Sequence, residues 1–257
     1  MIIWLASYPN SGNDFLRSLL SSYIFSKDGS YNEDVIQNID EFPNNSLFKK
    51  LGVDINNLDE MNKNYINSQK ILNKKDSIMF LKTFSCFVHT DKFKFTDRHN
   101  TLGVIYVVRD PRNIVFPLSQ SFQLSEEQSL NNLLIKTYLG KESQSHCTTY
   151  LSSWKDHYNS WKVFTRFNKY LLVKYEDLIK DTEKTFLNIL KFIAHLGRVK
   201  FTLDDIKFKN ALKTTELKKL NENDSKKFDQ IDPKIKYKLE KELENEMREL
   251  NYLENKF

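Results

Sequence analysis

The chain has 257 residues, which is enough for one α/β domain of ordinary size. Its 39 basic and 34 acidic residues leave a formal charge of +5, an excess too small to indicate a nucleic-acid-binding protein. The apolar run of Ile2 to Ala6 is too short for a signal peptide, and no segment is long enough to span a bilayer. The two cysteines, Cys86 and Cys147, lack metal-site spacing and indicate reduced thiols. We therefore expect a cytoplasmic protein without a transmembrane segment, in which residues 1–257 form a single domain.

The first elements expected are a buried strand, a tight polar loop and a helix. Ile2 to Ala6 suits a buried strand, and the turn formers Pro9, Asn10, Ser11 and Gly12 follow it. From Asn13 onward, apolar residues recur at helical spacing. The first backbone N–H groups of such a helix lack internal partners and attract anions, and a glycine lets a phosphate approach closely. The alternative is an ordinary strand-to-helix corner. A Walker A loop is excluded, because GxxxxGK[ST] is absent.

The next hundred residues predict two more strands. Residues 28–73 are polar and predict short helices and loops, with a bend at Phe42-Pro43. A second strand is expected over residues 77–83, followed by a polar connection over residues 86–100 that carries His89 and His99. Residues 101–109 form the strongest strand, because apolar residues fill it almost continuously.

This third strand ends at Arg109, which is followed by a helix start. Asp110 is a good N-cap and Pro111 fits the first helical position, so a helix is predicted towards Phe122 with a kink at Pro117. Arg109 then lies at the carboxyl edge of the sheet, where doubly wound proteins bind ligands. The alternative is an arginine that only pairs with a neighbouring aspartate.

The second half of the chain continues the alternation. Helices are expected over residues 126–138 and 148–167, the latter with an aromatic stripe that we interpret as core. A fourth strand over 170–174 leads to a loop at 175–178 and a helix from Asp181. Residues 203–228 are basic and polar, and 233–250 predict a last helix. Strands alternating with helices predict a parallel sheet covered on both faces, hence the α/β class.

Three segments also carry a family resemblance. Residues 8–15 read YPNSGNDF, residues 107–117 read VVRDPRNIVFP, and residues 153–178 include WKDHYNSW and LLVKYEDL. In this order they resemble the 5′-phosphosulfate loop, the 3′-phosphate segment, and the tryptophan helix with its YEDL loop in sulfotransferases that use 3′-phosphoadenosine 5′-phosphosulfate (PAPS), in particular bacterial cytosolic-type members. LKTF at residues 81–84 takes the place of the family's KTH, and MRELNYL resembles the way such chains often end.

The resemblance implies a P-loop-like three-layer α/β/α fold and transfer of a sulfuryl group from PAPS to a hydroxyl or amine. The acceptor would be a small molecule or a glycan, with no nucleic acid and no metal involved. The donor would be bound by Asn10, Ser11, Gly12, Asn13, Asp14, Phe15, Arg109 and Tyr175. Lys82 would supply catalytic charge, and His89 would act as the base; a plain surface histidine is the alternative for His89.

The sequence departs from the family pattern at several chemical positions. Asn10 replaces the loop lysine, Asp14 its second threonine, Phe15 the adenine-stacking tryptophan, Phe84 the catalytic histidine, and Pro117 the serine of the 3′-phosphate segment. The late basic Gly-rich loop is replaced by LKKLNENDSKKF at residues 217–228. Arg112 could take over part of the 3′-phosphate contact, or be solvated. Two hypotheses follow: an active sulfotransferase with a relocated base, or a catalytically impaired relative that binds nucleotide or a partner. A P-loop kinase is disfavoured, because no Mg²⁺-holding motif is present.

Overall fold

The computed structural model describes residues 1–73, 77–89, 93–139, 147–221 and 231–254. Its centre is a parallel five-stranded sheet with the strand order β2-β3-β1-β4-β7. The strands are β1 (Ile2–Ser7), β2 (Asp40–Glu41), β3 (Met79–Thr83), β4 (Thr101–Val108) and β7 (Tyr170–Lys174). The parallel sheet and the four predicted strands are confirmed. The two-residue edge strand β2 comes from the polar segment in which no strand was expected.

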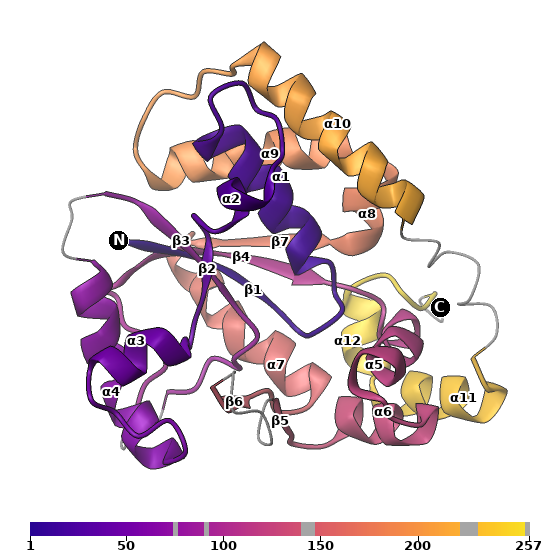
Figure 1. Cartoon of the computed structure of the whole chain (residues 1–257). Helices are drawn as coiled ribbons and strands as arrows, with labels where there is room; N and C mark the ends of the chain where they lie inside the picture. Colours follow the sequence, from indigo (N-terminus) through magenta and orange to yellow (C-terminus); the bar gives the residue numbers. More distant parts are fainter. Residues whose placement is uncertain (74–76, 90–92, 140–146, 222–230, 255–257) are drawn as a thin grey trace.

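Helices cover both faces of the sheet, so the fold has three α/β/α layers (Figure 1). This arrangement explains the continuous apolar runs: every residue of β1 is buried, and so are six consecutive residues at the end of β4. Side chains alternate along each strand, so Trp4 and Tyr106 enter one core while Leu5 and Ile105 enter the other.

The layer drawn above the sheet in Figure 1 holds helices α1, α2, α8, α9 and α10. Their bounds are α1 (Asn13–Phe25), α2 (Glu33–Ile36), α8 (Tyr175–Lys180), α9 (Thr182–Leu196) and α10 (Asp205–Asn221). Asp181 caps α9 as predicted, with its side chain accepting from the Lys184 N–H. One expectation was wrong: the YEDL segment is the first part of α8 rather than a loop. Helix α10 lies in the basic and polar segment for which no element was predicted.

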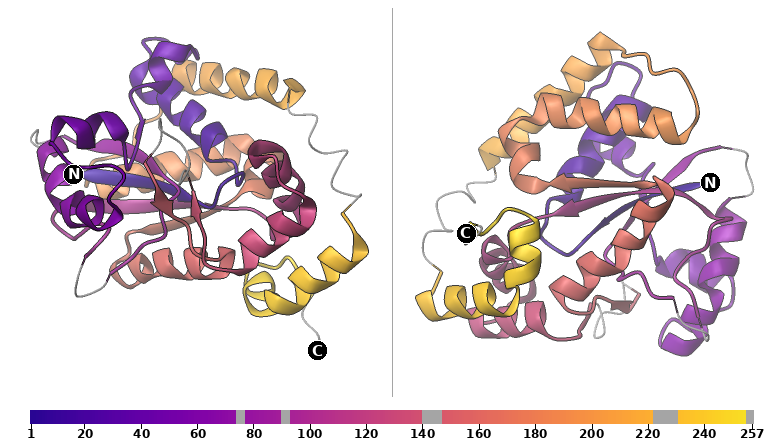
Figure 2. Two further views of the ribbon diagram at one scale, coloured as in Figure 1. Left: turned by 60° about the horizontal axis from the view of Figure 1, so that its bottom comes forward. Right: turned by 180° about the vertical axis from the view of Figure 1, so that it is seen from behind.

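The opposite layer contains the remaining helices and a short hairpin. Their bounds are α3 (Asn45–Lys50), α4 (Leu58–Leu72), α5 (Val115–Phe122), α6 (Glu126–Leu134), α7 (Trp154–Trp161), α11 (Pro233–Glu242), α12 (Glu244–Glu249), and the strands β5 (Tyr138–Leu139) and β6 (Thr149–Tyr150). Trp154, Tyr158 and Trp161 of α7 are buried, so the aromatic stripe is core. Helix α11 packs against α6 and against α12, and both views of Figure 2 show these last helices, in yellow, far from the amino terminus.

Four helix boundaries in this layer differ from the prediction. The helix expected over residues 126–138 ends at Leu134, and Tyr138 belongs to β5. The helix expected over residues 148–167 begins only at Trp154, because Ser153 caps it and Thr149–Tyr150 pairs with β5 instead. The helix expected from Pro111 is a 3₁₀ turn (Pro111–Asn113) followed by α5. Pro117 is the third residue of α5 and causes no break there, because first-turn N–H groups need no helical partner. The last helix is divided into α11 and α12. In the part of the chain that the structure describes, no helix is long and apolar enough to cross a membrane.

Candidate functional site

A hollow of about 260 Å³ lies where the strands of the sheet end at their carboxyl side. The segments that follow β1, β3, β4 and β7 all contribute to it. Its lining comprises Pro9, Asn10, Gly12, Asn13, Asp14, Phe15, Phe84, Arg109, Pro117, Ser121, Phe122, Leu139 and Tyr175. The sheet edge therefore brings together seven of the eight predicted nucleotide contacts; the eighth, Ser11, is buried just behind the surface.

The corner between β1 and α1 has the backbone shape that an anion site needs. Gly12 has φ 93° and Asn10 has φ 59°, so the loop turns sharply and the first N–H groups of α1 point out of the helix end. The amide of Asn13 donates to the Leu5 carbonyl at 2.9 Å and to Ser7 Oγ at 3.0 Å, which fastens the helix start to the strand. Ser11 Oγ is buried without a hydrogen-bond partner among the described residues.

Arg109 and Tyr175 form the wall opposite this corner. The Arg109 guanidinium is 4% exposed, lies 4.3 Å from the centre of the Tyr175 ring, and donates from Nη1 to the Asn10 carbonyl at 3.0 Å. The Tyr175 ring also explains Gly12, because a Cβ on residue 12 would lie 2.3 Å from Tyr175 Cδ2. Arginine, tyrosine and glycine thus form one packed unit from three segments that follow different strands.

Lys82 forms an ion pair with Asp14, one of the residues that line the hollow. Its ammonium lies 2.9 Å from Asp14 Oδ1 and 3.4 Å from Glu41 Oε2, and 4.4 Å from the centre of the Phe84 ring. The Lys82 side chain is 7% exposed, whereas that of Asp14 is 64% exposed. Asp14 is among the residues that line the hollow, and Lys82 is not.

Phe84 occupies the wall next to this ion pair, and a buried histidine holds its backbone. His157 Nε2 donates to the Phe84 carbonyl at 3.0 Å, so Nδ1 accepts from the Tyr106 hydroxyl at 2.7 Å. Burial lowers the pKa of His157 to about 4, so the ring is neutral at pH 7. Both ring nitrogens of His157 are thus engaged inside the core, and His157 does not line the hollow.

Two other predicted residues lie elsewhere. His89 is exposed, pairs through its backbone with Lys94, and does not line the hollow. Arg112 is held by Asp110 at 2.6 Å, by Glu240 at 2.7 Å and by the Tyr252 carbonyl, and it does not line the hollow either. Residues 222–228 of the expected late basic loop lie outside the described residues.

Sequence reasoning missed Ser121, Phe122 and Leu139. Ser121 lies one helical turn after Pro117, so it faces the same side of α5, and its hydroxyl donates to Asn10 Oδ1 at 3.2 Å. The spacing of four from Pro117 could have pointed to it. Leu139 belongs to the β5–β6 pair, and no local pattern indicates where that hairpin packs.

A second hollow has a volume of about 460 Å³. It is lined by Leu58, Asp59, Asn62, Tyr65, Ser85, Cys86, Val88, Phe93, Phe95, Lys136, Tyr138 and Tyr150. Two of these residues, Ser85 and Tyr138, are chain neighbours of Phe84 and Leu139, which line the first hollow. Five of the second hollow's residues are aromatic. Both cysteines are free thiols, and burial raises the pKa of Cys86 to about 11 and that of Cys147 to about 12.

These groups fit a phosphorylated nucleotide in several respects and conflict with it in one. Several features suit an anion. They are the exposed start of α1, the close approach that Gly12 allows, the Ser11 hydroxyl without a hydrogen-bond partner among the described residues, and the buried Arg109. The Asp14 carboxylate opposes an anion at the same helix end. No group of three or more potential metal-ligating side chains occurs among the described residues.

Comparison with known proteins decides the family. The model of the sulfotransferase domain matches residues 2–250. The chain belongs to the sulfotransferase domain family. A comparison with curated proteins found no match.

Solved structures agree with this fold. Mouse sulfotransferase SULT7A1 complexed with PAP is similar with a TM-score of 0.56 and 15% identity, covering 96% of this chain and 84% of that one. Retinol dehydratase in complex with androsterone and inactive cofactor PAP has a TM-score of 0.52 and 14% identity, covering 96% and 80%. At these identities the similarity shows only that this chain has the same three-layer fold. The chemistry of its site depends on the residues that this chain places there.

Proposed function

We propose that this sulfotransferase binds PAPS at the β1–α1 corner and transfers its sulfuryl group to a small acceptor. The observation that carries the proposal is the packed unit of Gly12, Arg109 and Tyr175 beside the open end of α1. A buried guanidinium and unpaired helix N–H groups on one hollow match an anion with two phosphorylated ends. The two similar solved structures hold PAP, the bisphosphate that remains when PAPS loses its sulfuryl group.

In this proposal the N–H groups at Gly12 and Asn13 hold the 5′-phosphosulfate, and Arg109 holds the 3′-phosphate. Phe15 offers a ring face to the adenine, where the family has tryptophan. Ser121 supplies the hydroxyl that Pro117 lacks, because both residues line the hollow from the same helix. Asn10 and Ser11 complete the loop as neutral hydrogen-bonding groups.

Catalysis depends on Lys82 exchanging partners. The acceptor oxygen attacks sulfur, the bond from sulfur to the phosphate oxygen breaks, and negative charge develops on the leaving bisphosphate. Lys82 can neutralise that charge only if its ammonium leaves Asp14, and the exposure of Asp14 makes this exchange cheap. Phe84 cannot accept the acceptor's proton, and His89 does not line the hollow, so this proton passes to solvent water. We therefore expect turnover about a hundred-fold or more below that of a site with a placed base.

The second hollow would hold the acceptor. Its aromatic lining from Tyr65, Phe93, Phe95, Tyr138 and Tyr150 favours a flat, largely apolar molecule over a glycan. The acceptor would extend past Phe84 and Leu139 to bring one hydroxyl or amine to the sulfuryl group. The alternative function is a relative that binds nucleotide without turnover, and the Asp14–Lys82 pair together with Phe84 favours it.

Calorimetric titration with adenosine 3′,5′-bisphosphate tests the nucleotide site. We expect saturable binding below millimolar ligand, and loss of binding in Gly12→Ala, because the new Cβ collides with Tyr175. Gly52→Ala is the matched control: Gly52 also has a positive φ, of 70°, but nothing lies within 4 Å of its Cβ position. Binding that is absent in the wild-type protein, or unaffected by Gly12→Ala, would refute the proposed site.

Incubation with radiolabelled PAPS then distinguishes the two functions. Donor consumption that rises with flat aromatic alcohols or amines identifies an active transferase, and Phe84→His should increase its rate by restoring a proton acceptor at the hollow. Nucleotide binding without donor consumption, in the wild-type protein and in Phe84→His alike, identifies the non-catalytic relative.

A further inference from the structure

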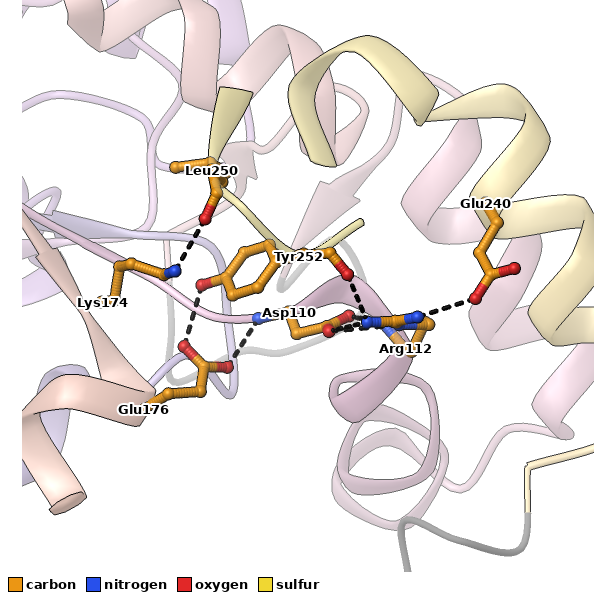
Figure 3. A network of polar contacts seen from close by, with 7 residues as sticks. All are labelled: Asp110, Arg112, Lys174, Glu176, Glu240, Leu250 and Tyr252. Carbon is orange, nitrogen blue, oxygen red and sulfur yellow. Dashed lines mark hydrogen bonds and ion pairs between the residues drawn. The ribbon is translucent and has the colours of Figure 1, made fainter. Parts of the chain in front are cut away.

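The C-terminal turn after α12 crosses the carboxyl ends of β4 and β7, as Figure 3 shows. Tyr252 lies in the centre of this contact and bonds to one residue that follows β7 and one that follows β4. Its hydroxyl donates to Glu176 Oε2 at 2.8 Å, and its carbonyl accepts from Arg112 Nη2 at 2.9 Å. Glu176 follows β7 and Arg112 follows β4, so one residue connects two loops that are more than 60 positions apart in the chain.

The same two loops are also connected directly. The other oxygen of Glu176 accepts from the Asp110 backbone N–H at 2.9 Å, and the Asp110 carboxylate pairs with Arg112 at 2.6 Å. Glu176 thus accepts from both Tyr252 and Asp110, one bond on each oxygen (Figure 3). A carboxylate held on both oxygens has little freedom to rotate, so it fixes the separation of the two loops.

Arg109 and Tyr175, which face the nucleotide hollow, each directly precede a residue of this contact. Arg109 is followed by Asp110, and Tyr175 is followed by Glu176. Arg109 stacks on Tyr175 at 4.3 Å. The next residue of each segment continues this contact, because the Asp110 N–H donates to Glu176. Any movement of Glu176 away from Asp110 would separate the guanidinium from the ring.

The surroundings keep Tyr252 in place and protonated. Lys174 donates to the Leu250 carbonyl at 2.7 Å, and its ammonium lies 4.4 Å from the centre of the Tyr252 ring. Glu240 of α11 pairs with Arg112 at 2.7 Å. Burial and the neighbouring Glu176 carboxylate raise the pKa of Tyr252 well above its usual value, so the phenol is a donor at neutral pH.

We propose that Tyr252 is a positioning residue for the nucleotide site: acting through Glu176, it sets the Arg109–Tyr175 stack that binds the 3′-phosphate. The proposal rests on the proposed function, because it assumes that nucleotide binds at this stack. It assigns the C-terminal turn a part in donor affinity, although Tyr252 does not line the hollow.

The test compares Tyr252→Phe with Tyr158→Phe. Tyr158 also donates its hydroxyl to the C-terminal region, to Glu249 Oε1 at 3.0 Å, but that contact does not involve Glu176. Both variants remove one hydroxyl that donates to a carboxylate, so a purely structural effect would be similar in both. We expect adenosine 3′,5′-bisphosphate to bind about ten-fold more weakly to Tyr252→Phe and with nearly unchanged affinity to Tyr158→Phe.

A double-mutant cycle tests whether Tyr252 acts through Glu176. Glu176→Gln has one acceptor oxygen for two donors, so it should weaken binding to a similar extent as Tyr252→Phe. In the double variant we expect little further loss, because the second substitution removes a contact that the first has already disabled. Additive losses would show that Tyr252 does not act through Glu176 and would overturn the proposal.

Hydrogen exchange of the Asp110 amide provides a measurement without nucleotide. This N–H donates to Glu176, so its exchange should be about ten-fold faster in Tyr252→Phe than in the wild-type protein or in Tyr158→Phe. Equal exchange in all three proteins would overturn the positioning role. Faster exchange with no nucleotide binding to any protein would confirm the mechanical link but refute the proposed function, so the two failures are distinguishable.

Discussion

Asp14 stabilises the fold but opposes the binding of an anion. As the second residue of α1, it stabilises the helix by about 0.3–1 kcal/mol through the helix dipole. Asp14 also lines the hollow, and its carboxylate pairs with the Lys82 ammonium. That ammonium is therefore not available to neutralise an incoming anion. We expect Asp14→Asn to bind adenosine 3′,5′-bisphosphate about ten-fold more tightly while unfolding at a slightly lower temperature. Calorimetry and a thermal melt measure the two effects.

Glu41→Gln is the control for that prediction. Glu41 contacts the same ammonium at 3.4 Å but does not line the hollow, so its removal should change nucleotide affinity much less. The gain from Asp14→Asn should also shrink at high ionic strength, since salt screens repulsion at an exposed carboxylate. A gain that is equal in both variants, or independent of salt, would contradict a local charge effect.

His157 should make the stability of the protein depend on pH. Its pKa is about 4 in the folded protein and 6.5 when unperturbed, so the unfolded chain binds more protons between these values. The free energy of unfolding should therefore fall as the pH drops from 6.5 towards 4, by about 3 kcal/mol for this residue. Urea unfolding at pH 7, 5.5 and 4.5 measures this, and His157→Gln should lose most of the slope. An unchanged slope would assign it to other groups.

Single residues differ in how visible they are from sequence. Gly12 and Arg109 could be found because each stands where a strand gives way to a helix, a position with local signals. Glu176 and Tyr252 could not, because their roles arise from a contact between residues 76 positions apart. The pairing of Lys82 with Asp14, 68 positions apart, is equally invisible to local pattern. The sequence predicted which residues line the hollow, but it did not predict which charged side chains pair with one another there.

Among the elements, the strands were predictable and several helices were not. Strands β1 and β4 are buried on both faces, so apolar composition alone reveals them. Helix α10 is rich in polar and basic residues, and few of its side chains give a regular apolar repeat, so its sequence resembled a solvated segment. Strands β5 and β6 have two residues each, and they exist only because they pair with one another.

Helix α10 depends on the close approach of one glycine. Gly29 has φ 86°, and a Cβ there would lie 2.3 Å from the Lys207 carbonyl oxygen of α10. We expect Gly29→Ala to destabilise the protein by about 3 kcal/mol or more, because it adds a backbone collision to the cost of a positive φ. Gly52→Ala, with open space around it, should cost only about 1 kcal/mol. Urea unfolding of both variants measures the difference, and equal losses would contradict the contact.

At the scale of the whole molecule, nucleotide binding should appear as thermal stabilisation. A ligand at a hundred times its dissociation constant adds about 2.7 kcal/mol to the free energy of unfolding. For a chain of 257 residues this raises the melting temperature by about 5–10 °C. Adenosine 5′-monophosphate is the control: it lacks the 3′-phosphate that Arg109 would bind and should stabilise less. Equal shifts with both nucleotides would argue against the assigned role of Arg109.

The central place of β1 has a consequence for synthesis on the ribosome. Its partners β3 and β4 begin at Met79 and Thr101, so β1 leaves the ribosome before either neighbour and must wait for both. Until then, a strand that is apolar from Ile2 to Ala6 is exposed to wrong pairing and aggregation, which is the usual hazard of parallel sheets. Tyr175 and Tyr252 emerge later still. The corner between β1 and α1 precedes all of these partners in the chain, so it can mature only as one of the last events of folding. A nascent-chain chaperone would have its greatest effect on this protein during that interval.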